Sequence, residues 1–293
     1  MTKSTEKLYG GDWTKRKLEI LRGYLNAYTQ ALKWQPSKDK PFKLMYIDAF
    51  AGTGKVELKT KSRDLADIRE FLDGSAEIAV KIYNKKPFDK LVFVEQKLTR
   101  YKKLLDLKRR YESQNIEVIN GDSNDYLQAL CSSWQTGYGG NWRGVLFLDP
   151  FATEVDWVTI EAVAKTRAFD TWIWFPVSSI ARMLPKDREP DQISAENLIR
   201  IFGDESWREL YDNPKQKRLS LGGPKSRDPG VDGIVEIYKG RLRSLVGGRF
   251  LKESHQFKNS RNSRMFELLF FAGSDRRKAV ELSRKIATHL MKN

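Results

Sequence analysis

The sequence of 293 residues contains a single cysteine and only two histidines. Cys131 has no second cysteine for a disulfide, and so few thiols and imidazoles exclude a metal centre with Cys and His spacing. Long apolar runs are also missing, since no stretch approaches the roughly 20 residues that cross a bilayer. The N-terminus is rich in Lys and Glu and lacks the apolar core of a signal peptide. We therefore expect a cytoplasmic protein with no metal and no membrane contact.

Acidic residues are scarce relative to basic ones. The chain has 53 Lys and Arg against 38 Asp and Glu, which gives a net charge of +15. The excess is uneven, because residues 241–293 hold thirteen basic and four acidic residues. An excess of this size usually indicates a polyanionic partner, although basic surfaces also occur on proteins that bind none. Nucleic acid is the partner that we expect, because a basic face attracts its phosphates.

Short apolar runs alternate with segments whose composition suits helices. Residues 13–34 place leucines at steps of three and four, which predicts an amphipathic helix. Five runs of strand length follow, the last of them rich in Trp and Phe. They cover residues 43–50, 90–95, 116–120, 144–151 and 168–177. Alternation of strands with helices favours a parallel sheet.

We expect one domain over residues 1–293 with two insertions. The polar segment 55–73 is predicted to be a surface loop or lid, and Ser75 is predicted to cap the helix that follows it. The segment 186–246 is predicted to be mainly helical. Its expected helices cover 196–202, 205–211 and 232–246, and two strands at 249–256 and 264–272 precede a final helix at 276–291.

A glycine-rich turn follows the first predicted strand, with the sequence Asp48-Ala49-Phe50-Ala51-Gly52-Thr53-Gly54. Glycines let a backbone approach its ligand closely, and a carboxylate at a strand end can hold a ribose or the amino group of methionine. A plain tight turn is the structural alternative. A Walker phosphate loop does not fit, because Ala49 and Val56 stand where Gly and Ser or Thr are required. The predicted cofactor-binding residues of this turn are Asp48, Phe50, Gly52 and Gly54.

Two more acidic residues follow the next two predicted strands. Glu95 is placed to accept hydrogen bonds from ribose hydroxyls, and Asp122 to accept one from an adenine amino group. Taken alone, each acid is equally compatible with a solvated residue that only caps the end of a strand. Because three acids follow three successive strands, the pattern favours a nucleoside site, and the cofactor that we expect is S-adenosyl-L-methionine.

The fourth predicted strand runs into Asp149-Pro150-Phe151. A carboxylate there can accept hydrogen bonds from an exocyclic amine while the aromatic ring stacks on the base, which aims the amine at a methyl donor. The structural alternative, given equal weight, is that Pro150 ends a buried strand and Asp149 caps the next helix. On the functional interpretation Asp149, Pro150 and Phe151 form the catalytic motif.

Several landmarks together resemble the three-Cys-motif partner family, TcmP. They are the turn 48–54, Gly74-Ser75, the strand end 147–151, Phe175-Pro176, Arg182, Phe202-Gly203 and Trp207. The resemblance implies a Rossmann-like class I methyltransferase fold and a partner protein of radical-SAM-like type that carries three cysteines. For this α/β fold we expect a seven-stranded, mostly parallel sheet in the order 3-2-1-4-5-7-6.

A looser similarity, to methyltransferases that act on amino groups of nucleic acids, covers the first four predicted strands. Their motif usually has a second proline, and Phe151 stands at that position here. We therefore keep three hypotheses: a methyltransferase acting on nucleic acid, a catalytically silent module that carries a cysteine-rich partner to nucleic acid, and a small-molecule methyltransferase.

Candidate substrate contacts lie in the second half of the chain. Arg182 follows the fifth predicted strand, where ligands meet the edge of a parallel sheet. Lys225 and Arg227 belong to a basic loop that can clamp a phosphate backbone or simply be solvated. Trp172 and Trp174 can line a base pocket, but aromatic residues on a central strand are more often part of the core.

Overall fold

A computed structural model describes residues 12–53, 55–58, 70–82, 88–134, 139–211, 231–259 and 261–292. Contacts within the chain divide it into two compact units, residues 1–122 and 123–293. Gly54, Lys225 and Arg227 lie outside the described residues, so their predicted roles have no structural counterpart here. None of the described helices is long and apolar enough to span a bilayer.

Seven strands form one sheet in the order β5-β4-β1-β6-β7-β9-β8. Their bounds are β1 Lys43–Asp48, β4 Lys90–Val94, β5 Ile116–Ile119, β6 Trp142–Leu148, β7 Phe169–Phe175, β8 His255–Lys258 and β9 Arg264–Phe271. Strand β4 runs parallel to β1 and β5, β6 runs parallel to β7, and β9 is antiparallel to both of its neighbours. Counted along the chain, this order is 3-2-1-4-5-7-6, so the predicted fold class is confirmed.

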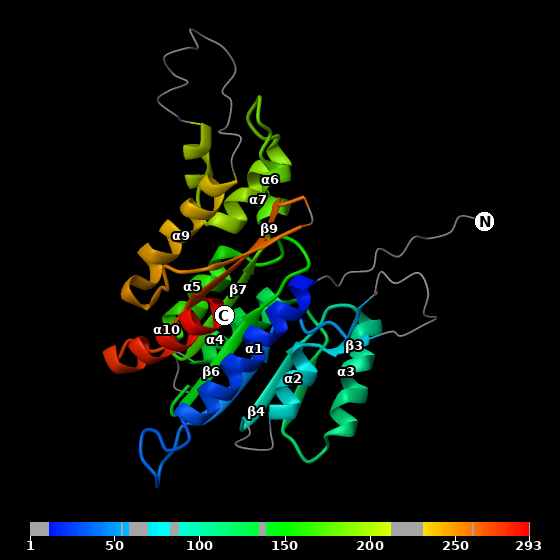
Figure 1. Ribbon diagram of the computed structural model, residues 1–293, viewed down its shortest axis with the longest axis vertical. Helices are drawn as coiled ribbons and strands as arrows, with labels where there is room; N and C mark the ends of the chain where they lie inside the picture. Colours follow the sequence, from blue (N-terminus) through cyan, green and yellow to red (C-terminus); the bar gives the residue numbers. More distant parts are fainter. Residues whose placement is uncertain are drawn as a thin grey trace, which may run out of the picture. The chain divides into compact units, whose positions relative to one another are not determined.

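The first unit combines strands β1, β4 and β5 with three helices, α1 Asp12–Ala31, α2 Ser75–Lys81 and α3 Leu98–Arg110. Helix α1 packs beside α2, and α3 packs against β5 (Figure 1). The predicted stripe on α1 is its buried face, with Leu18, Leu21 and Leu25 almost fully covered. Every residue of β1 after Lys43 is buried as well, so its carboxyl end is held firmly.

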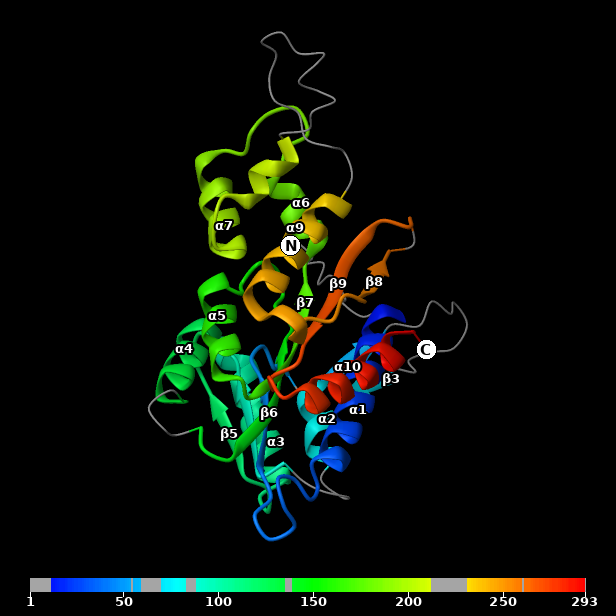
Figure 2. The ribbon, with the colours of Figure 1, turned by 90° about the vertical axis from the view of Figure 1, so that its left-hand side faces the viewer.

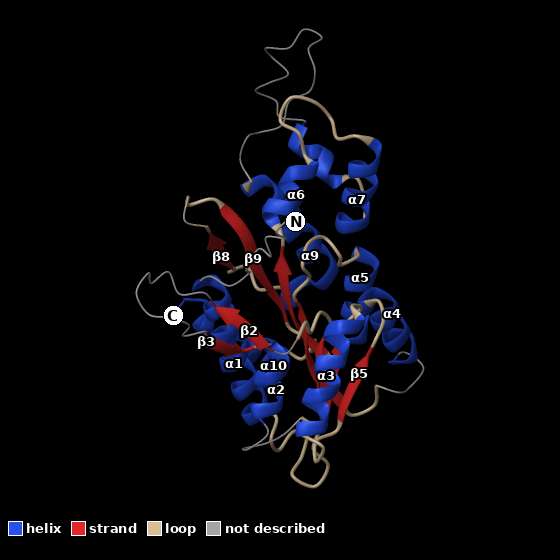
Figure 3. Ribbon diagram, turned by 90° about the vertical axis from the view of Figure 1, so that its right-hand side faces the viewer, coloured by secondary structure: helices blue, strands red, loops and turns tan. Residues whose placement is uncertain are grey.

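The insertion at 55–73 differs from the predicted loop or lid. Strands β2 Lys55–Leu58 and β3 Glu70–Asp73 pair antiparallel and form a second, two-stranded sheet (Figure 3). Polar and apolar residues alternate over Lys55–Leu58, which is a strand pattern that the overall polarity of the segment concealed. The helix that follows begins as expected, but its N-cap is Gly74 rather than Ser75, and no side chain caps it.

The second unit surrounds β6, β7, β9 and β8 with helices (Figure 2). Their bounds are α4 Ser123–Ser133, α5 Trp157–Thr166, α6 Val177–Met183, α7 Gln192–Phe202, α9 Asp232–Val246 and α10 Arg277–Lys292, with 3-10 turns at Ser206–Tyr211 and Gly247–Arg249. Helices α4 and α5 pack side by side, and α9 contacts both α5 and α6. The helical prediction for 186–246 agrees with α7, the first 3-10 turn and α9.

The strand predicted at 249–256 is wrong for most of its length. Gly247–Arg249 forms a 3-10 turn, and only His255–Lys258 pairs as strand β8. Phe250 makes an isolated bridge to Phe271, and Leu251 donates a backbone hydrogen bond to Phe270 at 3.0 Å. The two buried apolar residues gave the segment its strand-like pattern, whereas the polar residues after Leu251 interrupt the pairing.

Aromatic residues of β7 belong to the core of the second unit. All seven residues of this strand are buried. The ring of Trp174 lies 4.4 Å from that of Phe257 and 4.8 Å from that of Phe266, and Trp172 contacts Phe270 at 4.9 Å. The structural alternative is therefore confirmed for Trp172 and Trp174, which fill space between strands.

Packing also accounts for the Phe202-Gly203 landmark. Gly203 ends α7 with a φ of +82°, and a Cβ there would lie 2.0 Å from Cδ1 of Trp157. Arg241 lies over the indole of Trp157 at 4.9 Å and donates to the carbonyl of Phe202 at 3.0 Å. Phe202 and Gly203 thus help to pack α5, α7 and α9 together, and this packing accounts for their place in the pattern.

Candidate cofactor and acceptor sites

Asp48 ends β1 and is fully buried. Its Oδ1 accepts a hydrogen bond from the backbone N–H of Phe50 at 3.3 Å, and its Oδ2 accepts one from the Tyr46 hydroxyl at 3.5 Å. One residue further on, the N–H of Ala51 donates to the carbonyl of Val94 at 3.0 Å. The carboxylate therefore shapes the turn, and β4 anchors it.

Gly52 has a φ of +62°, a conformation that side chains other than glycine seldom adopt. A Cβ added there would meet no atom of the described residues within 4 Å. The glycine is thus required by the backbone rather than by close packing. Open space beside a backbone turn at the carboxyl end of a parallel strand is where a ligand can approach.

Glu95 follows β4 directly and is 6% exposed. Its backbone N–H donates to the carbonyl of Ile119 at 3.0 Å, which continues the pairing of β4 with β5. The side chain is also fixed, because Oε1 accepts from the N–H of Lys97 at 2.7 Å and Oε2 lies 3.9 Å from the Arg100 guanidinium. Each oxygen of a carboxylate can accept more than one hydrogen bond, so Glu95 keeps the capacity to accept from a ribose hydroxyl.

Asn120 ties the ends of β4 and β5 together. Its amide Nδ2 donates to the carbonyls of Glu95 at 2.9 Å and Gln96 at 3.0 Å. Asp122 follows two residues later and is half-buried. Because β1, β4 and β5 are parallel and in register, Asp48, Glu95 and Asp122 come to the same edge of the sheet within the first unit.

The Asp149-Pro150-Phe151 motif follows β6 in the second unit. Asp149 is half-buried, Pro150 is buried and Phe151 is 59% exposed. The N–H of Phe151 donates to Oε2 of Glu154 at 2.8 Å, so the loop curls back on itself. An exposed aromatic ring on a fixed backbone can stack on a planar ligand.

Side chains from two helices hold this loop, and no motif in the sequence predicted them. Asn124 in α4 donates to the carbonyl of Glu154 at 2.7 Å and accepts from the N–H of Asp156 at 3.0 Å. Arg200 in α7 forms an ion pair with Asp156 and donates to the carbonyl of Thr153 at 2.7 Å. These contacts join residues 30 or more positions apart, which explains why no local motif revealed them.

Arg182 lies in α6 and is exposed. Its guanidinium donates to the hydroxyl of Ser179, one helical turn earlier, at 3.1 Å. The position agrees with the expectation that it follows β7 at the carboxyl edge of the sheet. Its role as a substrate contact stays a prediction.

Cys131, the single cysteine of the chain, is buried. Burial in α4 raises the pKa of the Cys131 thiol to about 12, so the thiol is protonated at neutral pH. Within the described ranges, no three His, Cys, Asp or Glu side chains are placed to hold a metal ion.

No protein-family model and no curated protein matches the chain. Among solved structures, protein LPL1258 from Legionella pneumophila, of the family DUF519, aligns with 94% of this chain and 92% of its own at 14% identity and a TM-score of 0.49. Trm1 from Pyrococcus horikoshii, solved with S-adenosyl-L-methionine, aligns with 96% of this chain and 61% of its own at 9% identity and a TM-score of 0.42. Human methyltransferase-like protein 13, in complex with SAH, covers 96% and 93% at 11% identity and a TM-score of 0.39. The fold assignment rests on the strand order rather than on these alignments.

Proposed function

We propose that this chain is an S-adenosyl-L-methionine-dependent methyltransferase that acts on an amino group of a nucleic-acid base. The observation that carries the proposal is the shared edge of β1, β4 and β5, where Asp48, Glu95 and Asp122 stand beside the open turn at Gly52. Carboxylates at this edge of a parallel sheet are the groups that bind the ribose and amine of a nucleoside ligand.

The residues of this edge fit the cofactor in different ways. Glu95 would bind the ribose hydroxyls and Asp122 the adenine amine, while Phe50 and Gly52 would contact the ligand through the open side of the turn. Asp48 would act by holding that turn, since its side chain is fully buried and its oxygens accept hydrogen bonds from Phe50 and Tyr46. When bound, the cofactor supplies a methyl group on a positively charged sulfonium, next to which negative carboxylates are favourable.

On the acceptor side, Asp149 would accept hydrogen bonds from the target amine and Phe151 would stack on its base. Alignment of the amine supplies much of the rate enhancement, so the motif needs no strong general base. Arg182, Lys225 and Arg227 are the proposed contacts to the rest of the substrate. The net charge of +15 supports a polyanionic substrate.

Calorimetric titration with S-adenosyl-L-methionine tests the cofactor site. We expect Glu95→Ala and Asp122→Ala each to weaken binding about tenfold or more, because each removes a charge-assisted hydrogen bond. Asp48→Ala is expected to abolish binding by releasing the turn. Asp106→Ala, which removes an exposed acid of α3, is the matched control and should leave the affinity unchanged. A folded wild-type protein that does not bind would refute the proposal.

A silent module remains a second candidate function, because Phe151 occupies the position of the second proline. In this version the chain is a TcmP-type protein that binds nucleic acid and a three-cysteine, radical-SAM-like partner without transferring a methyl group. Transfer of a labelled methyl group to DNA or RNA by the purified chain would exclude it. Cofactor binding without transfer, alone or with a three-cysteine partner, would favour it.

A further inference from the structure

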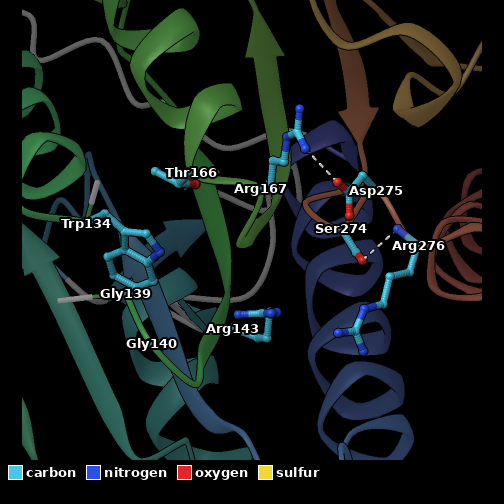
Figure 4. Close-up of a pocket in the computed structure, with 9 residues that line it drawn as sticks. All are labelled: Trp134, Gly139, Gly140, Arg143, Thr166, Arg167, Ser274, Asp275 and Arg276. Carbon is cyan, nitrogen blue, oxygen red and sulfur yellow. Dashed lines mark hydrogen bonds and ion pairs between the residues drawn. The ribbon is translucent and has the colours of Figure 1, made fainter. Parts of the chain in front are cut away.

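Arginines from three separate segments of the second unit line one open hollow (Figure 4). Arg143 is the second residue of β6, Arg167 lies just before β7, and Arg276 directly precedes α10. The hollow has a volume of about 300 Å³ and also includes Ser274 and Asp275. The amino ends of two neighbouring parallel strands therefore carry a concentrated positive charge.

A second hollow of about 520 Å³ adjoins the first, since Arg167 and Asp275 line both. It adds Arg249, Arg277 and Arg284. We call these six residues the arginine surface: Arg143, Arg167, Arg249, Arg276, Arg277 and Arg284. Five of the six come from residues 160–293, which include the most basic part of the sequence.

Few acids offset this charge. Asp275 pairs with Arg167 at 2.7 Å, and Glu281 pairs with Arg277 at 2.8 Å. Arg249 instead donates to the carbonyls of Ala164 and Gly273 at 3.2 Å. Burial, and then the neighbouring charge of Arg167, lower the pKa of Arg249, so the cations here repel one another. A bound anion would relieve that repulsion.

Arg276 is the most available of these groups. It is exposed, and its guanidinium makes no hydrogen bond or ion pair with the part of the chain that the structure describes. In Figure 4 it lies, with Arg143, on the same side of the Arg167–Asp275 ion pair. Arg143 is half-buried and donates one N–H from Nη1 to the carbonyl of Trp142 at 2.6 Å. A guanidinium carries five N–H donors, so both arginines that line this hollow can donate to phosphate oxygens.

The hollow does not suit a base or a free nucleoside. Trp134 is its aromatic residue, but this side chain is 7% exposed and packs on Phe169 with ring centroids 4.8 Å apart. Gly139 lies against the indole as well, so close that a Cβ there would be 2.1 Å from Nε1. With no exposed aromatic face among its described lining residues, the surface can recognise phosphates but not stack a base.

The arginine surface is also separate from the acceptor motif. Arg143 and Asp149 stand near opposite ends of β6, and six residues of extended strand span about 20 Å. One phosphate could not reach both places. A polynucleotide could, because a duplex rises about 3.4 Å per base pair, so six base pairs cover this length.

We propose that the arginine surface binds backbone phosphates of the nucleic-acid substrate, remote from the base that reaches Asp149. The identity of the polymer rests on the proposed function; the phosphate chemistry rests on the arginines themselves. Contacts to phosphate fix the position and register of a nucleic acid without reading its sequence. The surface would thus set affinity and salt dependence, and the acceptor motif would set chemistry.

Fluorescence anisotropy with labelled 20-nucleotide DNA and RNA tests this surface across a series of NaCl concentrations. We expect the double variant Arg143→Gln/Arg276→Gln to bind both oligonucleotides about tenfold more weakly and to flatten the salt slope by about 1.4, or 0.7 for each phosphate of a single strand. The control Lys103→Gln/Arg109→Gln removes the same charge from exposed positions of α3. Equal behaviour of the two double variants would overturn the proposal.

Three further measurements keep the outcome unambiguous. Arg276→Gln alone repeats the test if the double variant unfolds, because this exposed side chain makes no hydrogen bond or ion pair with the described residues. Competition with inorganic phosphate and AMP separates binding of a polymer from binding of small anions. AMP that binds as tightly as the oligonucleotides would overturn the proposal.

Cofactor affinity and methyl transfer are measured on the same preparations. Arginine-dependent oligonucleotide binding without methyl transfer would refute only the proposed function, and methyl transfer with unchanged binding by the variants would refute only this inference.

Discussion

The carboxyl ends of the strands are held in different ways in the two units. In the first unit, backbone hydrogen bonds between neighbouring strands fix Glu95 and Ala51, and the acids Asp48 and Glu95 are buried. In the second unit, side chains of α4 and α7 hold the loop after β6, and Phe151 projects with 59% of its surface exposed. The first edge carries buried acids that the neighbouring strands support, and the second carries an exposed ring on a loop that helix side chains support.

This difference matches what each ligand would require. A site that is formed before binding loses little conformational entropy of its own when the cofactor arrives. A base in a polymer must enter from solvent and leave again, which favours an exposed ring on a loop. The comparison predicts that substitutions at the two edges have separable effects.

The largest effect should come from Asp149→Ala. We expect the rate of methyl transfer to fall about 100-fold or more, because the target amine loses the group that aligns it. The affinity for S-adenosyl-L-methionine should stay within twofold of wild type, since Asp149 belongs to the acceptor side. Single-turnover transfer of a labelled methyl group, with calorimetry on the same protein, measures both quantities.

Asp187→Ala serves as the control because it removes an exposed acid from the loop between α6 and α7 of the same unit. Methyl transfer at the wild-type rate by the Asp149 variant would remove this residue from the mechanism. An equal loss of cofactor affinity would instead show that the two edges are not separate.

The sequence predicted the parts of this comparison that depend on local pattern. Burial of whole strands leaves continuous apolar runs, so β1, β4, β5, β6 and β7 were each located within a few residues. The acids at the ends of β1, β4 and β5 lie within or next to these apolar runs in the sequence. Their gathering at one edge then follows from parallel pairing alone, which is why Asp48, Glu95 and Asp122 could be grouped without a structure.

The remaining features depend on contacts between distant residues. Asn124 and Arg200 support the loop after β6 from 30 to 47 positions away, and neither stands in a recognisable motif. Arg143, Arg167 and Arg276 become neighbours only through the packing of β6, β7 and α10. Composition indicated that the end of the chain is basic, but it could not indicate where those charges meet.

A smaller effect is expected from Phe151→Ala. Loss of one stacking ring should weaken binding of the acceptor oligonucleotide about tenfold, since stacking on a base contributes about 1–3 kcal/mol. The exposed ring supports little of the core, so the melting temperature should hardly change. KM for the oligonucleotide is the measurement, and Phe151→Tyr should restore it. An unchanged KM in the alanine variant would show that the ring does not touch the acceptor.

Effects of tenfold or less should come from the two supports themselves, and together they give the sharpest comparison. Arg200→Gln removes the ion pair to Asp156 and the hydrogen bond to Thr153, so the acceptor loop loosens. We expect methyl transfer to slow about tenfold, within the range for a misplaced reacting group, with cofactor affinity unchanged.

Asn120→Ala is the reciprocal variant in the first unit. It removes two hydrogen bonds to the carbonyls of Glu95 and Gln96, so the carboxylate that would bind the ribose loses part of its support. Each neutral hydrogen bond contributes about 1 kcal/mol, and cofactor binding should weaken about fivefold while the rate at saturating cofactor stays near wild type. Calorimetry and saturation kinetics measure the two effects. If either variant changed both quantities equally, the two edges would act as one cooperative site, and the contrast between them would be structural without being functional.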